Sequence, residues 1–193
     1  MKYKSRFLNV EQNVSDLGCA VIEVNGIAPP HRRVQDAQVL VCEHDAPVVL
    51  LNIYVEVDAD GFITTSCFKE ILSNDDYVVV LCGQHVHILD IASHSIESLY
   101  LNDYVGHIYA VPDYTEDTLS ENFLVTTYRF VFLINVAQGI LWKSEECGID
   151  GVLIHGISDN IIFGSGDWDP PGGWEDFWLS LINGKPCNVA ISD

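Results

Sequence analysis

Residues 77–101 read YVVVLCGQHVHILDIASHSIESLYL, and this stretch decides the fold. It holds three short apolar runs, rich in Val, Ile and Leu, which are separated by turn-forming residues at 83–85 and 92–95. Short β-branched runs broken by turn residues are typical of strands, and such close spacing leaves no room for crossover helices. The stretch therefore predicts an antiparallel meander of three strands.

The same pattern recurs further along the chain. Residues 87–91 (HILDI) align with residues 132–136 (FLINV) at a shift of 45 residues. A third copy begins at residues 160–163 (NIIF), takes an insertion, and resumes at residues 179–185 (LSLINGK). Repeats of about 40 to 50 residues with several strands each are typical of propeller blades. The sequence therefore predicts an internal repeat of about 45 residues, clearest in residues 77–187.

The rest of the chain has the same short apolar runs. Strands are expected at residues 39–42, 48–57, 77–82, 86–91, 96–101, 123–127, 131–136, 151–157, 160–163 and 177–181. The only expected helix is one turn at residues 68–72, with Thr65 or Ser66 as its N-cap. We expect a single all-β domain over residues 1–193, built from antiparallel meanders in a small propeller-like or open-propeller stack, with a β-sandwich as the alternative.

Acidic residues dominate the charge of the chain. It has 28 Asp and Glu against 9 Lys and Arg, which gives a formal net charge of −19. Between Val34 and Tyr128 the only basic residue is Lys69, against sixteen acids. Such a field repels the phosphates of nucleic acids and attracts basic proteins. We therefore expect a basic protein partner and no nucleic acid; the alternative is that the acidity only keeps the protein soluble.

Composition also indicates where the protein works. A hydrophobic content of 48% excludes intrinsic disorder. No window approaches the roughly 18 apolar residues of a membrane span, and the polar residues 9–13 interrupt any signal-peptide core. We therefore expect a cytoplasmic protein that does not bind membranes. Its six cysteines, which are widely spaced and form no C-x-x-C pair, are expected to be reduced and without disulfides.

The most unusual stretch is residues 164–178, GSGDWDPPGGWEDFW, where three of the four tryptophans stand beside four carboxylates. The Pro-Pro and Gly-Gly pairs predict a rigid loop between two strands. Tryptophan is enriched in interface hot spots, and an acidic rim suits a basic partner. The candidate partner-binding residues are Asp167, Trp168, Asp169, Trp174, Glu175 and Asp176. The alternatives are a sugar-stacking platform that includes Trp178, an oxygen-ligand cation site, and a structural plug at the edge of the last sheet.

The run GSGDWDPPGGWEDFWLSLINGK at residues 164–185 resembles the C-terminal signature of small bacterial β-proteins. Such proteins are the immunity partners of polymorphic and contact-dependent growth-inhibition toxins. The resemblance covers roughly residues 120–187, and it transfers no functional residues to this chain. It implies an immunity protein that binds a cognate toxin. This fits the acidic charge, because many such toxins are basic nucleases whose substrate cleft an acidic protein can cover.

The sequence also contains features that bear on a metal site and on an enzyme active site. His85 and His87 form an H-x-H pair on one face of a strand, with His94 or His107 as conceivable further metal ligands, but no acid or cysteine spacing supports a metal. The chain has no G-x-S-x-G, H-E-x-x-H or Gly-rich nucleotide motif. We therefore expect no enzyme activity, metal or cofactor. A carbohydrate or small-ligand binding β-domain and a hydrolase with an unrecognised site stay as alternatives.

Overall fold

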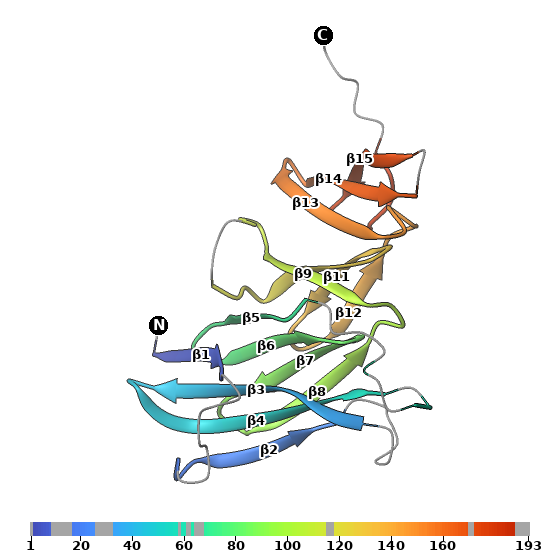
Figure 1. Cartoon of the computed structure of the whole chain (residues 1–193). Coiled ribbons are helices and arrows are strands. Elements are labelled where there is room, and N and C mark those ends of the chain that lie inside the picture. Colours follow the sequence, from blue (N-terminus) through green and yellow to red (C-terminus); the bar gives the residue numbers. More distant parts are fainter. Residues whose placement is uncertain are drawn as a thin grey trace. The chain divides into compact units, whose positions relative to one another are not determined.

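The computed structural model describes residues 2–8, 17–25, 33–57, 59–60, 63, 68–114, 118–169 and 172–187 of the chain (Figure 1). Of this part, 65% is strand and none is helix, so the all-β class is confirmed. The described residues accordingly contain no helix that could cross a membrane. The chain divides into two compact units, Met1–Asn102 and Asp103–Asp193, and each is described by itself. The single domain expected from the sequence stays a prediction.

The first unit begins with a four-stranded sheet. Its strands are β1 (Tyr3–Phe7), β2 (Ala20–Val24), β3 (Arg33–Glu43) and β4 (Ala46–Glu56), in the order β1-β3-β4-β2. The long strands β3 and β4 form a hairpin whose turn residues, His44 and Asp45, both have positive φ. Positive φ at both central residues matches the twist of the two strands. The strand β2 pairs in parallel with β4, which makes this sheet mixed.

The second sheet of this unit is a meander of β5 (Glu70–Ser73), β6 (Tyr77–Cys82), β7 (His85–Asp90) and β8 (Ser95–Tyr100). The helical turn expected at residues 68–72 is therefore wrong, and its proposed caps Thr65 and Ser66 lie outside the described residues. Glu70–Ser73 instead pairs with the buried strand β6. Tertiary pairing with a buried strand overrides a weak local preference for helix.

The two sheets of the first unit share one hydrophobic core. One face of β6, with Val78, Val80 and Cys82, packs in the same buried cluster as the inward face of β3 and β4. Val39 and Leu51 are among the β3 and β4 side chains of that cluster, and both are fully buried. Because side chains alternate between the two faces of a strand, each of these sheets turns one apolar face toward the other. The apolar interface between the two sheets stabilises the unit.

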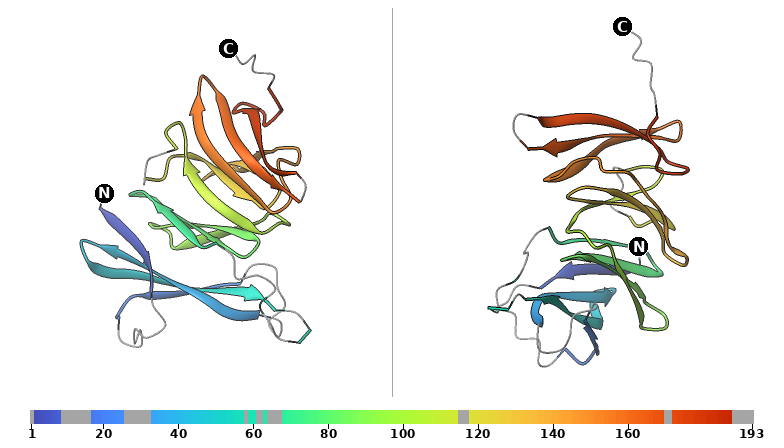
Figure 2. Two further views of the ribbon diagram at one scale, coloured as in Figure 1. Left: turned by 45° about the horizontal axis from the view of Figure 1, so that its top comes forward. Right: turned by 90° about the vertical axis from the view of Figure 1, so that its right-hand side faces the viewer.

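The second unit also contains two sheets. The first is a meander of β9 (Val105–Ala110), β10 (Asn122–Thr127), β11 (Val131–Asn135) and β12 (Gly139–Lys143). The second has three strands, β13 (Gly151–Ser158), β14 (Ile161–Trp168) and β15 (Gly173–Ser180). Figure 2 shows these two sheets, yellow and orange to red, as successive layers. Side chains of β10, β11, β13, β14 and β15 form the core between them, including Leu124, Leu133, Val152, Ile162 and Leu179.

The antiparallel meander expected from the sequence is confirmed in three sheets: β5–β8, β9–β12 and β13–β15. The 45-residue shift takes Val78 of β6 to Phe123 of β10, and His87 of β7 to Phe132 of β11. The third of these sheets has only three named strands, and its last strand lies at an edge. A propeller-like stack of all four sheets stays a prediction.

Candidate functional site

The tryptophan-rich segment is a β-hairpin and not the rigid loop expected from the sequence. The strands β14 and β15 pair over their whole length, from Ile161↔Ser180 to Trp168↔Gly173. Asp169 directly follows β14 and Gly172 directly precedes β15, and the N–H of Gly172 donates to the carbonyl oxygen of Asp169 at 2.8 Å. Pro170 and Pro171 lie outside the described residues. Gly173 has a φ of +73°, a conformation that glycine adopts without strain. The tryptophans of this segment therefore belong to the two strands and not to a loop.

Strand alternation divides the six candidate residues between two faces. Side chains of Ile162 and Leu179 point into the core, so the opposite side of the sheet is its outer face. Three cross-strand pairs form the outer face: Asp167↔Trp174, Ser165↔Asp176 and Phe163↔Trp178. Asp167, Trp174 and Asp176 therefore lie together there, whereas Trp168 and Glu175 belong to the other face. Asp169 is exposed in the turn.

Exposed aromatic rings cover small residues on the outer face. The side chain of Trp174 is 53% exposed, and that of Phe163 is 42% exposed. A β carbon on Gly156 would lie 2.3 Å from the ring of Phe163, and one on Gly151 would lie 3.7 Å from the indole of Trp174. Both rings therefore lie across neighbouring strands and present a flat apolar surface. At this exposure Trp174 does not act as a buried plug of the sheet.

Carboxylates flank this aromatic surface. Asp167 is directly across the sheet from Trp174, and Asp176 follows it by two residues on the same face. Between residues 144 and 184 the sequence has eight Asp and Glu and no Lys or Arg. The only ionisable nitrogen on this sheet belongs to His155, whose Nε2 lies 2.7 Å from Oγ of Ser165. The outer face therefore combines apolar rings with net negative charge.

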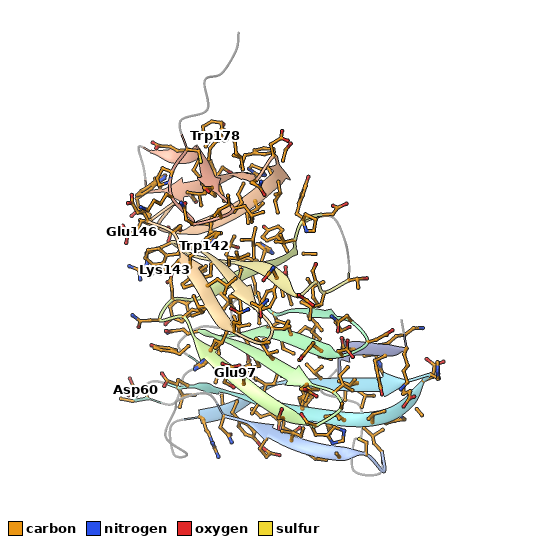
Figure 3. The ribbon with its side chains drawn as sticks, turned by 180° about the vertical axis from the view of Figure 1, so that it is seen from behind. Asp60, Glu97, Trp142, Lys143, Glu146 and Trp178 are labelled. Atoms are coloured by element: carbon orange, nitrogen blue, oxygen red, sulfur yellow. The ribbon has the colours of Figure 1, made fainter. Side chains whose placement is uncertain are left out.

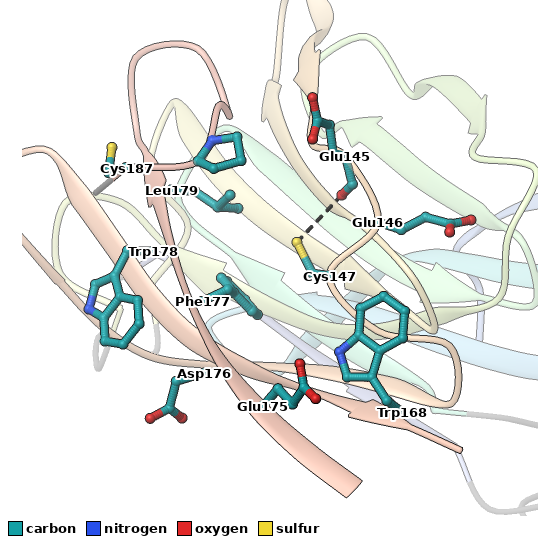
Figure 4. A pocket seen from close by; sticks show the side chains of 11 residues that line it. Glu145, Glu146, Cys147, Trp168, Glu175, Asp176, Phe177, Trp178, Leu179 and Cys187 are labelled. Atoms are coloured by element: carbon teal, nitrogen blue, oxygen red, sulfur yellow. Dashed lines mark hydrogen bonds between the residues drawn. The ribbon is translucent and has the colours of Figure 1, made fainter. Parts of the chain in front are cut away.

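A groove of about 300 Å³ borders β15 (Figure 4). One wall is the segment after β12, with Glu145, Glu146 and Cys147, and the other is the run of five residues Glu175–Leu179. Trp168, Pro186 and Cys187 complete its lining. The guanidinium of Arg129 lies 3.5 Å from the carboxylate of Glu146, but both side chains are exposed and such pairs contribute little. The groove is therefore acidic.

The buried thiol of Cys147 carries no charge into this groove. Its Sγ donates a hydrogen bond to the carbonyl oxygen of Glu145, 3.4 Å away (Figure 4). Burial raises the pKa of Cys147, because removal from water disfavours the thiolate. The charge of the groove therefore comes from its carboxylates.

Four residues of this region were missed from the sequence: Phe163, Glu145, Glu146 and, among the partner-binding candidates, Trp178. The spacing Trp174, Asp176, Trp178 at i, i+2 and i+4 is a strand signal that could have placed Trp178 with the other two. Phe163 faces Trp178 only through the strand register, and the two glutamates reach the groove only through tertiary packing. The positions of Phe163, Glu145 and Glu146 therefore could not be predicted from the local sequence.

His85 and His87 lie on one face of β7, as expected for an H-x-H pair. Their rings are stacked, with centroids 5.6 Å apart and an angle of 8° between the planes. Nδ1 of His87 lies 2.8 Å from Oγ of Ser98, whereas Nε2 of His85 is buried without a partner among the described residues. No group of three or more potential ligands that could hold a metal occurs in the part of the chain that the structure describes.

Comparison of the chain with protein-family models and with curated proteins gives no match. The function is therefore argued from the geometry and chemistry of the outer face and of the groove beside β15.

Proposed function

We propose that this chain is an acidic binding protein of the immunity type, which neutralises a cognate toxin by direct protein–protein contact. The observation that carries the proposal is the position of Trp174, which is 53% exposed on the outer face and flanked by Asp167 and Asp176. A large rigid indole makes a strong anchor in a protein interface. Carboxylates around it favour a basic partner and accelerate the encounter.

The charge of the whole chain supports the same proposal. A net charge of −19 attracts a basic protein over long distances at low salt. The resemblance of residues 120–187 to immunity proteins includes the whole outer face. A toxin that binds nucleic acid would present the basic surface that such a face complements.

A carbohydrate ligand is the second candidate. A hollow of about 210 Å³ on the sheet is bordered by Phe163, Trp178 and Asp159. Aromatic rings beside a polar group can stack on the apolar face of a sugar and fix its orientation. A neutral sugar would bind with little dependence on salt, whereas a basic protein would not.

The experiment measures association and dissociation rates with the product of the neighbouring gene, tested as the candidate toxin, at low and at physiological salt. Truncation by Trp174→Ala should weaken binding by on the order of 2 kcal/mol or more, mainly through faster dissociation. The variant Asp167→Asn should mainly slow association and reduce its salt dependence, because rim charges steer the encounter.

Two substitutions on β8 in the other unit serve as matched controls. Tyr100→Ala removes an aromatic side chain that is 40% exposed, and Glu97→Gln removes an exposed carboxylate. Both controls should bind the toxin as the unchanged protein does. Salt-independent association together with unchanged affinity in Trp174→Ala would exclude the proposed function.

A further inference from the structure

Within the described residues, the last sheet has only the beginning of a fourth strand. In the meanders β5–β8 and β9–β12 the third strand is paired on both sides, whereas β15 has a named strand only on one side. The chain starts to fill this position after β15: Ser180 N–H donates to the carbonyl of Lys185 at 2.8 Å, and Cys187 N–H donates to the carbonyl of Trp178 at 2.9 Å. This pairing covers only the end of β15.

These two hydrogen bonds identify the backbone groups that face the free edge. In an antiparallel strand, alternate residues direct both their N–H and their C=O to the same side. Trp178 and Ser180 direct theirs away from β14, so Trp174 and Asp176 do the same. No residue in the described part of the chain bonds to these groups of Trp174 and Asp176. They form an open row of donors and acceptors.

The acidic groove runs along this edge. Its lining includes the consecutive residues Glu175–Leu179, and consecutive residues of a strand point to opposite faces. A groove that touches residues of both faces therefore reaches the edge of β15. Its far wall is formed by Glu145–Cys147, in the segment that follows β12.

We propose that the free edge of β15 pairs with an extended basic segment of the protein partner, which adds a fourth strand to this sheet. The inference rests on the proposed function and names how the partner is held. Backbone pairing with Trp174 and Asp176 would supply affinity, and the carboxylates of Glu145, Glu146 and Glu175 would select Lys or Arg side chains along the segment.

Charge argues against two other occupants of the edge. Residues 188–193 of this chain (NVAISD) contain an acid and no Lys or Arg, so they do not complement an acidic groove. A second copy of the chain carries the same net charge of −19, and like charges oppose its approach.

The test uses three blocked octapeptides and the full chain, with titration followed by tryptophan fluorescence and by amide exchange. One peptide alternates Lys and Val, the second has the same sequence with its inner amides N-methylated, and the third alternates Glu and Val. We expect the Lys-Val peptide to bind and to protect the amides of Trp174 and Asp176 from exchange. N-methylation should weaken it at least about tenfold, because it removes backbone donors and keeps the charge. The Glu-Val peptide should not bind.

A variant pair separates backbone pairing from charge. Asp176→Pro removes both the edge N–H and the carboxylate, whereas Asp176→Asn removes only the charge, so the proline variant should bind the Lys-Val peptide at least about tenfold more weakly. If the proline variant does not fold, the comparison of the Lys-Val peptide with its N-methylated form, both titrated into the unchanged protein, tests the backbone pairing instead.

Equal affinity for the two Lys-Val peptides would overturn the inference. So would binding that appears only after residues 188–193 are deleted, because the edge would then belong to the chain itself. Toxin binding that is the same in Asp176→Pro and Asp176→Asn would overturn the edge pairing and leave the proposed function intact. Failure of the unchanged protein to bind the toxin would instead overturn the proposed function.

Discussion

Nε1 of Trp142 donates a hydrogen bond to the carbonyl oxygen of Leu181, 3.0 Å away, and so joins β12 to the turn that follows β15 (Figure 3). The same indole lies against Gly184, where a β carbon would come within 2.5 Å of the ring. This contact sets the direction of the chain after β15. It therefore positions Lys185–Cys187, which pair with the end of β15; the rest of this edge has no partner in the part of the chain that the structure describes.

Two glycines with the same backbone conformation should differ in their response to alanine. Gly184 and Gly173 have φ values of +67° and +73°, but a β carbon would meet the Trp142 ring only at Gly184. Gly173→Ala should cost about 1 kcal/mol of unfolding free energy through backbone strain alone. Gly184→Ala should cost about 1–3 kcal/mol more, because the indole must move. Urea unfolding measures both, and equal losses would show that Trp142 does not hold this turn.

The cysteines should react with iodoacetamide in an order set by burial. Cys82 is fully buried and its Sγ donates to Oδ2 of Asp36 at 3.3 Å, while Cys187 is partly exposed. Burial, and then the nearby Asp36 carboxylate, raises the pKa of Cys82, so the reactive thiolate is rare. Mass spectrometry of the native protein should find Cys187 labelled well before Cys82 and Cys147. Labelling of Cys82 at the rate of Cys187 would contradict the buried position of β6.

Stability should fall as the pH is lowered from 7 to 5.5, in part because of His87. Burial, and to a lesser extent the neighbouring His85, lowers the pKa of His87 from 6.5 to about 3. Between pH 6.5 and about pH 3, His87 is therefore protonated in the unfolded chain and neutral in the folded chain. The folded state loses stability as the pH falls through this range, because proton binding favours the unfolded state. For one histidine this loss is roughly 1 kcal/mol between pH 7 and 5.5.

The variant His87→Gln should remove that part of the pH dependence, even if it lowers stability at every pH. Burial also lowers the pKa of His85, so a double variant with His85→Gln should be flatter still. Chemical unfolding at pH 7, 6 and 5.5 measures the difference. The same slope in His87→Gln and in the unchanged protein would show that folding does not lower the pKa of His87.

The strands most clearly visible in the sequence are those whose side chains are apolar on both faces. Tyr77–Cys82 and Val131–Asn135 are nearly all buried, so their runs stand out without any knowledge of the partner strand. The strand β1 was not expected, because Tyr3–Phe7 alternates with Lys and Arg and resembles a polar terminus. The parallel pairing of β2 with β4 depends on contacts far apart in the chain, and no local pattern reports it.

The candidate site was predicted by composition and not by geometry. Tryptophans and acids at residues 164–178 singled out the segment that forms β14 and β15, because their enrichment there is visible in the sequence alone. The Pro-Pro-Gly-Gly turn was taken for a longer loop, which concealed the division of Trp168 and Trp174 between two faces. The open edge of β15 could not be predicted, since it depends on which strands pair in the folded sheet.

Hydrogen exchange of the chain in complex with its proposed toxin partner, with the product of the neighbouring gene as the candidate, tests the central claim most directly. The measurement compares amide protection in the free and the bound chain, peptide by peptide, with the toxin at saturating concentration. We expect new protection to concentrate in residues 161–180, which carry the outer face and the free edge of β15, while peptides from β6 and β7 stay unchanged. Unaltered exchange throughout residues 161–180 in a saturated complex would contradict the claim that this hairpin captures the partner.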